Sequence, residues 1–382
     1  MHGIIIGGGI GGMALAAALE RVGLSYEVHE QAEELREVGA GLGLWSNALL
    51  ALARVGAVEE LTRLGAVVAR LEVRTSDGRL LAVTPFARAE DRSGLPGYLC
   101  VHRAEILRAL MHRSQRARVR LCSRCVGIEE RHGGVLARFA DGHEAHGDFL
   151  VGADGLRSSV RAQLFGDEPP RYSGYTCWRG VAPLEQTALP PHTAFEAWGR
   201  GRRFAVHHCG RGRLFWWACH NEPANGTDSA AGRKADVLKL FSHWQEPIAA
   251  AVAATPEILR HDILDRPPTR VWGRGRITLL GDAAHPTTPN LGQGACQAIE
   301  DAVVLADQLR RAGDSEGALR AFEKIRQRRT ARITKQSLRL GWICQWENPM
   351  GCWLRNMGAR FTPPSISRRF MEQFLMTDLP EL

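Results

Sequence analysis

Apolar runs and glycines alternate at the start of the chain in a pattern that predicts a strand, a helix and a second strand. Residues 2–6 end in three isoleucines before Gly7, as expected of a short buried strand. Residues 13–20 are mostly alanine and leucine, and Gly23 follows as a helix cap. Residues 26–29 predict the second strand. This order is typical of a Rossmann-like α/β unit, in which a helix crosses over between parallel strands.

The same alternation returns later in the chain. A strand is expected at 148–151, followed by a turn at 152–155 and a helix. Residues 276–280 predict another buried strand, and a long helix is expected from Gly292 toward Leu309. The region between these segments is rich in aromatic and β-branched residues, which predict strands of a separate sheet at 175–181, 203–208 and 214–220.

The composition is that of an ordinary globular protein. Of the 382 residues, 45% are hydrophobic and 24% are charged, so disorder is not expected. The formal charge of +8 comes without a helix-turn-helix, zinc-finger or RNA-binding signature, so no nucleic-acid partner is expected. We find neither a secretory signal nor an apolar run of membrane-spanning length. A cytoplasmic protein is therefore expected, and its oligomeric state is left open.

Cysteines and histidines do not form a metal signature. The nine cysteines are scattered, and the single C-x-x-C at Cys122 and Cys125 has no second pair at zinc-finger spacing. Reduced thiols are the expectation. The histidines of interest also lack ligand spacing, so no metal is expected at His207, His208, His220 or His285.

The glycine-rich turn after the first strand carries the first chemical motif. Gly7, Gly9 and Gly12 form G-x-G-x-x-G between a strand and a helix, and Glu30 ends the second strand. The glycines allow a tight turn and a close approach to a pyrophosphate, which the unpaired N–H groups of the helix N-terminus can bind. The acid can accept a bond from a ribose hydroxyl. This motif predicts a dinucleotide site but leaves FAD and NAD open.

Two distant motifs decide between these cofactors. Gly152-Ala153-Asp154-Gly155 follows a strand, and Asp154 stands where it can cap the next helix. Much later, Gly281-Asp282 ends a strand and leads through Pro286 and Pro289 into a glycine-rich helix start. The proline-rich loop is short of N–H donors, and the helix start offers a positive end to a developing anion. A reduced flavin is such an anion.

Together these three motifs resemble the class A, single-component flavoprotein monooxygenases. That family includes the p-hydroxybenzoate, salicylate and urate hydroxylases and zeaxanthin epoxidase. The resemblance runs from residue 2 to about residue 340, and residues 281–302 are its most specific part. It implies FAD as the cofactor, with NADH or NADPH as a transient co-substrate.

The resemblance also implies which residues hold FAD. The N-terminal glycines and Glu30 would hold the ADP half, Asp282 the ribityl chain, and residues 292–294 the pyrimidine edge of the flavin. The full set of implied cofactor residues is Gly7, Gly9, Gly11, Gly12, Glu30, Gln31, Gly41, Gly43, Arg103, Val126, Asp154, Asp282, Gly292, Gln293, Gly294 and Ala295.

Substrate residues are expected on the aromatic strands and the proline-rich loop. The candidates are Arg203, Phe215, Trp217, Pro289 and Asn290. In the urate hydroxylases the position of Asn290 resembles an aspartate, so this chain departs from a urate site.

The resemblance implies a reaction as well. A flavin C4a-hydroperoxide would hydroxylate or epoxidise a small aromatic or polyene-like substrate with O2. An FAD-dependent reductase of an unsaturated, prenyl-type substrate and a flavin-binding protein without enzymatic activity stay open as alternatives. So does an NAD-dependent dehydrogenase that uses residues 7–12 alone, although it leaves residues 281–294 unexplained.

The fold expected from these elements is α/β with a discontinuous FAD-binding domain. Residues 1–171 and 271–340 form this Rossmann-like domain, with a small sheet insertion near 66–101. A mixed or antiparallel β-sheet substrate domain is inserted at 172–270. A helical region follows at 341–382, where the tail is broken by prolines.

Overall fold

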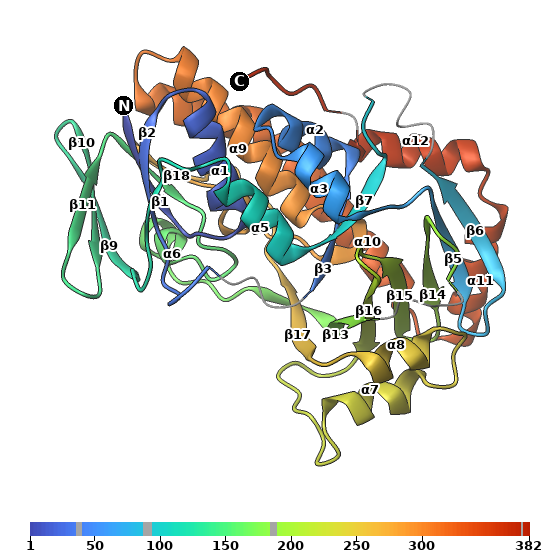
Figure 1. Ribbon diagram of the computed structural model, residues 1–382. Helices are drawn as coiled ribbons and strands as arrows, with labels where there is room; N and C mark the ends of the chain where they lie inside the picture. The colour runs from blue at the N-terminus through green and yellow to red at the C-terminus, as the bar shows by residue number, and fades with distance from the viewer. Residues whose placement is uncertain (36–39, 87–93, 184–188, 376) are drawn as a thin grey trace.

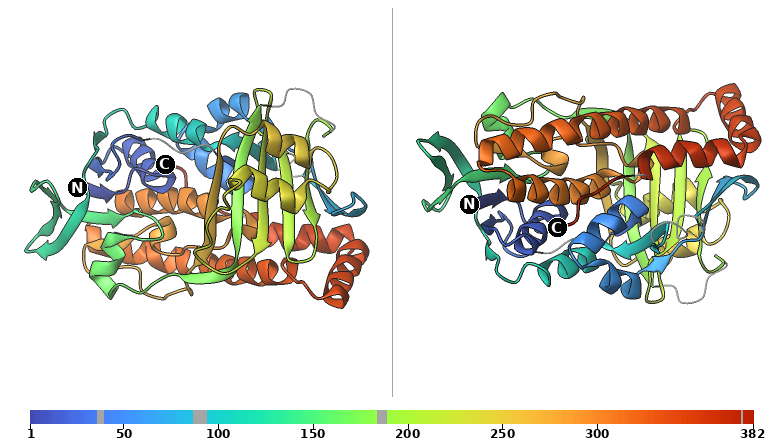
Figure 2. Two further views of the ribbon diagram at one scale, coloured as in Figure 1. Left: turned by 90° about the horizontal axis from the view of Figure 1, so that it is seen from below. Right: turned by 90° about the horizontal axis from the view of Figure 1, so that it is seen from above.

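A computed structural model describes residues 1–35, 40–86, 94–183, 189–375 and 377–382 (Figure 1). It confirms an α/β architecture with a Rossmann-like sheet, a larger mixed sheet and a helical C-terminal region. The two large sheets lie at opposite ends of the molecule, and the long C-terminal helices run alongside both of them (Figure 2).

The first sheet is parallel and has the strand order β18-β12-β1-β2-β8. Its strands are short and buried because helices cover them, as in other parallel sheets. Helix α1 (Ile10–Arg21) crosses from β1 to β2, and α9 (Gly294–Arg311) packs against it. The strand bounds are β1 (His2–Ile6), β2 (Ser25–His29), β8 (Arg118–Arg120), β12 (Phe149–Gly152) and β18 (Ile277–Leu279).

The second sheet has seven strands in the order β17-β13-β16-β15-β14-β5-β6. All neighbours are antiparallel except β14 and β5, so the sheet is mixed. The strands are β5 (Arg70–Thr75), β6 (Leu80–Pro85), β13 (Arg171–Pro183), β14 (Thr193–Trp198), β15 (Arg202–His208), β16 (Arg213–Asn221) and β17 (Ile258–Asp265). Strands β5 and β6 come from the region expected to form a small insertion in the first domain. They extend the large sheet instead, through the pairing of β5 with β14.

The two faces of the large sheet have different roles. Side chains alternate along a strand, so Trp216 and Phe204 point to one face while their neighbours Trp217 and Arg203 point to the other. Helices α7 (Arg233–Phe241) and α8 (Ile248–Ala254) cover the first face and bury it in an apolar core. The opposite face looks toward the Rossmann-like sheet and is free to line a site.

Two small sheets complete the strands. Sheet β3-β7-β4 lies between the large sheets, and β11-β10-β9 forms a projecting meander (Figure 1). Their bounds are β3 (Gly41–Trp45), β4 (Ala66–Val67), β7 (Tyr98–His102), β9 (Cys125–Arg131), β10 (Gly134–Phe139) and β11 (Glu144–Gly147). The short helices near them are α2 (Ser46–Arg54), α3 (Val58–Leu64), α5 (Arg103–Met111) and α6 (Ser159–Phe165).

The C-terminal region is helical, as expected. Helix α9 (Gly294–Arg311) is followed by the 30-residue α10 (Ser315–Cys344), then α11 (Pro349–Phe361) and α12 (Pro364–Leu375). The last two helices begin at prolines of the tail, where the missing N–H costs nothing. Within the described residues, no helix is long and apolar enough to cross a membrane.

Candidate active site

The glycine-rich turn after β1 is shaped by steric necessity. Gly7 has φ of +109°, and a Cβ on Gly12 would lie 1.9 Å from the Gly7 carbonyl oxygen. These two positions therefore require glycine because the turn folds back on itself. Gly9 instead faces open space, since a Cβ there would meet nothing within 4 Å. Helix α1 starts at Ile10, so its N-terminus opens onto this space.

Glu30 reaches this turn from the end of β2. Its carboxylate accepts bonds from the backbone N–H of Gly8 at 2.7 Å and of Ala32 at 2.9 Å. The acid thus lies beside the phosphate-binding turn, as a ribose-binding carboxylate must.

The opposite wall is built by the segment from β18 to α9. Gly281 adopts φ of +61° directly after the strand, and Asp282 follows it at the surface of a deep cavity. The Asp282 side chain is exposed to this cavity. The protein around the cavity keeps water from the carboxyl and raises its pKa, against the opposing charges of His285, Arg103 and Arg179. The first turn of α9 begins at Gly294, close to the Asp282 side chain.

A buried ionic network holds this wall in place. Asp301 of α9 accepts a bond from the backbone N–H of Gly281 at 3.0 Å and pairs with His285 at 2.6 Å. Arg326 of α10 donates to Asp301 at 2.7 Å and to Glu300 at 2.5 Å. Burial would raise the pKa of Asp301, but His285 and Arg326 outweigh it and lower the pKa to about 2. Charges this deep in the protein are tolerated because each is paired.

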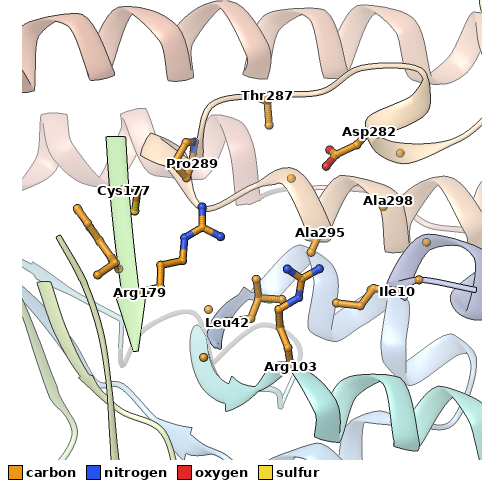
Figure 3. Close-up of a pocket in the computed structure, with 18 of the residues that line it drawn as sticks. Ile10, Leu42, Arg103, Cys177, Arg179, Asp282, Thr287, Pro289, Ala295 and Ala298 are labelled. Atoms are coloured by element: carbon orange, nitrogen blue, oxygen red, sulfur yellow. The ribbon is translucent and has the colours of Figure 1, made fainter. Parts of the chain in front are cut away.

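The two walls enclose a continuous cavity. One part has a volume of about 360 Å³ and lies against the large sheet, and an adjoining part of about 630 Å³ extends to Glu30. Arg103 from α5 and Arg179 from β13 both point into it (Figure 3). The residues that line both parts are Gly9, Arg103, Arg179, Asp282, Thr287 and Pro289.

This cavity fits an elongated dinucleotide such as FAD. The helix N-terminus at Gly9 suits the pyrophosphate, and two cationic side chains add positive charge beside it. Asp282 can bond to a polyol chain, and the N-terminus of α9 faces the region where a flavin ring would lie. In the wall of this cavity Gly41 of β3 lies against the Phe215 ring, where a Cβ would be 2.2 Å from that ring, so this position requires glycine.

Arg203 and Asn290 form the centre of the substrate side. The Arg203 side chain is 2% exposed and donates to Gln345 at 2.9 Å, Glu196 at 3.2 Å and Asn290 at 2.5 Å. Burial would lower the pKa of Arg203, but nearby Glu196 outweighs it and raises the pKa, so the side chain stays charged. The guanidinium also lies 5.3 Å from the centroid of the Trp217 ring.

Helix α10 fixes the position of Asn290. The Asn290 amide donates to the Tyr175 hydroxyl, to Thr288 and to the backbone carbonyl of Ser337, each at 3.0 Å. A Cβ on Gly341 would lie 2.2 Å from this amide nitrogen, so a glycine inside α10 makes room for it.

The structure brings most of the predicted residues together. Around the cavity lie Gly9, Gly11, Glu30, Gly41, Gly43, Arg103, Arg203, Phe215, Trp217, Asp282, Pro289, Asn290, Gly292, Gly294 and Ala295. Six candidates lie outside its lining: Gly7, Gly12, Gln31, Val126, Asp154 and Gln293. Gly7 and Gly12 shape the turn from behind, and Gln293 is buried in a hydrogen-bond network with Asn47 and Gln297.

Asp154 and Val126 have local explanations. One Asp154 oxygen accepts bonds from the backbone N–H groups of Ser159 at 2.7 Å and Val160 at 3.2 Å, which caps α6. Its other oxygen is buried and has no partner among the described residues. Val126 is 51% exposed on β9.

Sequence reasoning missed Arg179 and the thiols of Cys177 and Cys219, which all line the cavity. They belong to strands that the sequence did predict. Alternation along β13 would have placed Cys177 and Arg179 on one face, but it could not say that this face borders the cofactor.

Comparison with known proteins agrees with this geometry. Residues 1–337 match the family described as FAD binding domain. The chain is 41% identical to aurachin C monooxygenase/isomerase of Stigmatella aurantiaca, over 92% of both chains. It is 34% identical to 2-heptyl-3-hydroxy-4(1H)-quinolone synthase of Pseudomonas aeruginosa, over 99% of this chain and 98% of that one.

A solved structure shares the arrangement of the two sheets and the helices. The crystal structure of HpxO from Klebsiella pneumoniae in complex with FAD and uric acid superposes with a TM-score of 0.91. The two proteins are 29% identical, and the match covers 98% of this chain and 96% of that one.

Proposed function

Because the chain belongs to the FAD binding domain family and is an FAD-dependent monooxygenase, we propose that its substrate is a bicyclic heteroaromatic ring of the 4(1H)-quinolone type. One atom of O2 enters the ring as a hydroxyl group, the other leaves as water, and NAD(P)H supplies the two electrons. When bound, the flavin passes these electrons to oxygen. The protein positions the ring and keeps water away.

Arg203 carries this proposal. A guanidinium has five N–H donors, and three bonds from it to protein groups hold it in place. The remaining donors can bind the exocyclic oxygen of a quinolone, whose ring would stack among Phe215, Trp217 and Tyr98 of the cavity wall. The Arg203 guanidinium has the neutral side chain of Asn290 as a neighbour. At this position an acid is expected in the urate hydroxylases.

Comparison of two relatives of equal identity supports a quinolone over urate through the extent of the match and through Asn290. The 2-heptyl-3-hydroxy-4(1H)-quinolone synthase matches this chain from end to end, and its name states a hydroxylated quinolone product. The FAD-dependent urate hydroxylase of Klebsiella pneumoniae is also 34% identical, over 85% of this chain. The amide at Asn290 favours the first of these, because it cannot take a proton from a ligand.

The test is turnover of the FAD-loaded enzyme with NADPH or NADH under isotopically labelled O2. We expect a 2-alkyl-4(1H)-quinolone to accelerate NAD(P)H oxidation and to gain one labelled oxygen atom, whereas urate does neither. Acceleration by urate, or a quinolone product without label, would contradict the proposal.

A substitution at Asn290 sharpens this test. Asn290→Asp places a carboxylate against Arg203, which removes part of its positive potential toward the ligand. We expect the quinolone KM to rise about tenfold, roughly the effect of one charge-assisted hydrogen bond. Asn348→Asp at the exposed start of α11 is the matched control, because aspartate caps a helix as asparagine does, and its KM should equal that of the unmodified enzyme.

A further inference from the structure

Four side chains on neighbouring strands of the large sheet form a row that crosses the strands. His261 of β17 pairs with Cys177 of β13, which pairs with Cys219 of β16, which pairs with Arg203 of β15. Directly opposed residues of antiparallel strands project from the same face. Cys177, Cys219 and Arg203 line the 360 Å³ part of the cavity, and His261 lines the adjoining part.

The two thiols are close enough to react with each other. Directly opposed residues of antiparallel strands have Cβ atoms about 4.5–5.5 Å apart. A disulfide needs about 3.5–4.5 Å, so a shift of about 1 Å closes the bond. Both cysteines are free, are exposed by no more than 2%, and pack in one small cluster with Tyr175 and Ile263. They are reached from the cavity and not from the outer surface.

Their surroundings make the two sulfurs unequal. Cys177 has Arg179 two residues further along the same face, and Arg203 lies one strand beyond Cys219. A hydrogen bond from Cys219 lowers the pKa of the Cys177 thiol against the effect of burial, and the two guanidinium groups lower it further. Burial raises the pKa of Cys219. Cys177 is therefore the nucleophile of the pair, because the thiolate is the reactive form.

We propose that Cys177 and Cys219 form a redox-active cross-strand dithiol that hydrogen peroxide formed in the same cavity oxidises to a disulfide. Peroxide arises when the enzyme reduces O2 without oxygenating a substrate: O2, NAD(P)H and a proton give hydrogen peroxide and NAD(P)+. The inference rests on the monooxygenase activity of the chain and not on the identity of its substrate.

The chemistry balances in two steps. The Cys177 thiolate attacks peroxide, so that an S–O bond forms, the O–O bond breaks, and the departing hydroxide takes a proton to become water. The Cys219 sulfur then attacks the sulfenic sulfur, so that the S–S bond forms and the S–O bond breaks with loss of a second water. The two thiols are oxidised by two electrons, and peroxide is reduced to two water molecules.

The chain contains a matched internal control. Cys100 and Cys209 also interact closely, and burial and the neighbouring thiol raise the pKa of Cys100. Both are fully buried, and neither appears among the described residues that line the two parts of the cavity. If proximity of two thiols were sufficient, this second pair would oxidise as well. If peroxide from the cavity is required, only Cys177 and Cys219 will be oxidised.

The experiment uses the FAD-loaded enzyme with NADPH and air, without substrate and with catalase present. After alkylation of remaining thiols, peptide mass mapping under non-reducing conditions should show the Cys177–Cys219 disulfide, with Cys100, Cys209 and the exposed Cys122 still as thiols. Free Cys177 and Cys219 after many turnovers would overturn the proposal. So would a disulfide that forms only when catalase is left out, because peroxide would then act from bulk solution.

Two further experiments test the dithiol without relying on NADPH oxidation by the enzyme. Hydrogen peroxide added without NADPH should give the same disulfide, even in a preparation that does not oxidise NADPH. In Cys219→Ser, peroxide should leave a Cys177 sulfenic acid that dimedone traps, whereas in Cys177→Ser the remaining Cys219 should stay a thiol. Dimedone labelling of Cys219 instead would overturn the assignment of the nucleophile.

Discussion

Asp282 is the only acidic side chain that lines both parts of the cavity among the described residues. Its place after β18, next to the first turn of α9, allows it to accept bonds from the sugar-like chain of FAD. We expect Asp282→Ala to weaken FAD binding by about tenfold to a hundredfold, the effect of losing a charged hydrogen bond of about 1.5–3 kcal/mol. The measurement is the flavin absorbance retained after gel filtration, followed by titration of the apoprotein with FAD.

Asp77→Ala is the control for this substitution. Asp77 is 57% exposed and pairs only with surface residues of the β5–β6 turn. Its variant should bind FAD as the unmodified protein does. Full flavin occupancy in Asp282→Ala would contradict the assignment of the Asp282 carboxylate to the FAD site.

Among single residues, some site positions could be predicted from the sequence and others could not. Glycines and acids of the three motifs were identified because their spacing along the chain carries the information. The cavity positions of Arg179, Cys177 and Cys219 depend on which strands pair and in which register, and one sequence does not reveal this. The anchoring of Asn290 by α10 was equally hidden, because it joins segments 47 residues apart.

Helices α9 and α10 are joined by the buried pairs of Arg326 with Glu300 and Asp301. Removing Arg326 takes one cation from each of these buried carboxylates and leaves Glu300 with Arg329 and Asp301 with His285. Loss of such a buried partner costs about 3 kcal/mol. We expect Arg326→Met to lower the free energy of unfolding by this amount in urea titrations. Arg131→Met is the control, because Arg131 pairs with Glu129 at the surface of β9 and such pairs contribute about 0–1 kcal/mol. Equal losses in both variants would contradict the assigned role of the network.

The same network predicts how stability depends on pH. The pKa of Asp301 is lowered to about 2 in the folded protein, against about 3.9 for an unperturbed aspartate. Its contribution to stability is therefore complete above the unfolded pKa and is lost as pH falls toward the folded one. From pH 5 to pH 3 this group should account for a loss of about 1 kcal/mol. Asp301→Asn should show a correspondingly shallower decline in urea titrations at these pH values; an unchanged slope would contradict the assignment.

Among helices and strands, the apolar pattern predicted those whose position depends on the local sequence alone. Strands β1, β2, β12 and β18 and helices α1 and α9 were expected close to where they lie. The partnership of β5 and β6 with the large sheet was not expected. Their parallel neighbour β14 is more than 100 residues away, and no local pattern encodes that pairing.

In the whole molecule, FAD would contact both the N-terminal glycine-rich turn and the segment of residues 281–295, which are far apart in the sequence. A ligand that binds only the folded state stabilises it by about 2.7 kcal/mol at a free concentration of one hundred times its Kd. We expect the thermal midpoint to rise steadily with added FAD, and to rise much less in Asp282→Ala. A midpoint that does not change with FAD in the unmodified protein would contradict binding across both segments.

The discontinuity of the Rossmann-like domain has a consequence for biosynthesis. Strand β18 and helix α9 complete a site that starts at the glycine-rich turn of residues 7–12, and all strands of the large sheet lie between that turn and β18 in sequence. A ribosome that has made the glycine-rich turn must therefore still synthesise the sheet, the proline-rich loop and the start of α9 before a flavin can be held. The nascent N-terminal strands spend this interval without the partner strand and helix that bury them. Cofactor supply thus acts on the released or nearly finished chain, and chaperones that shield exposed β-strands are most needed before that point.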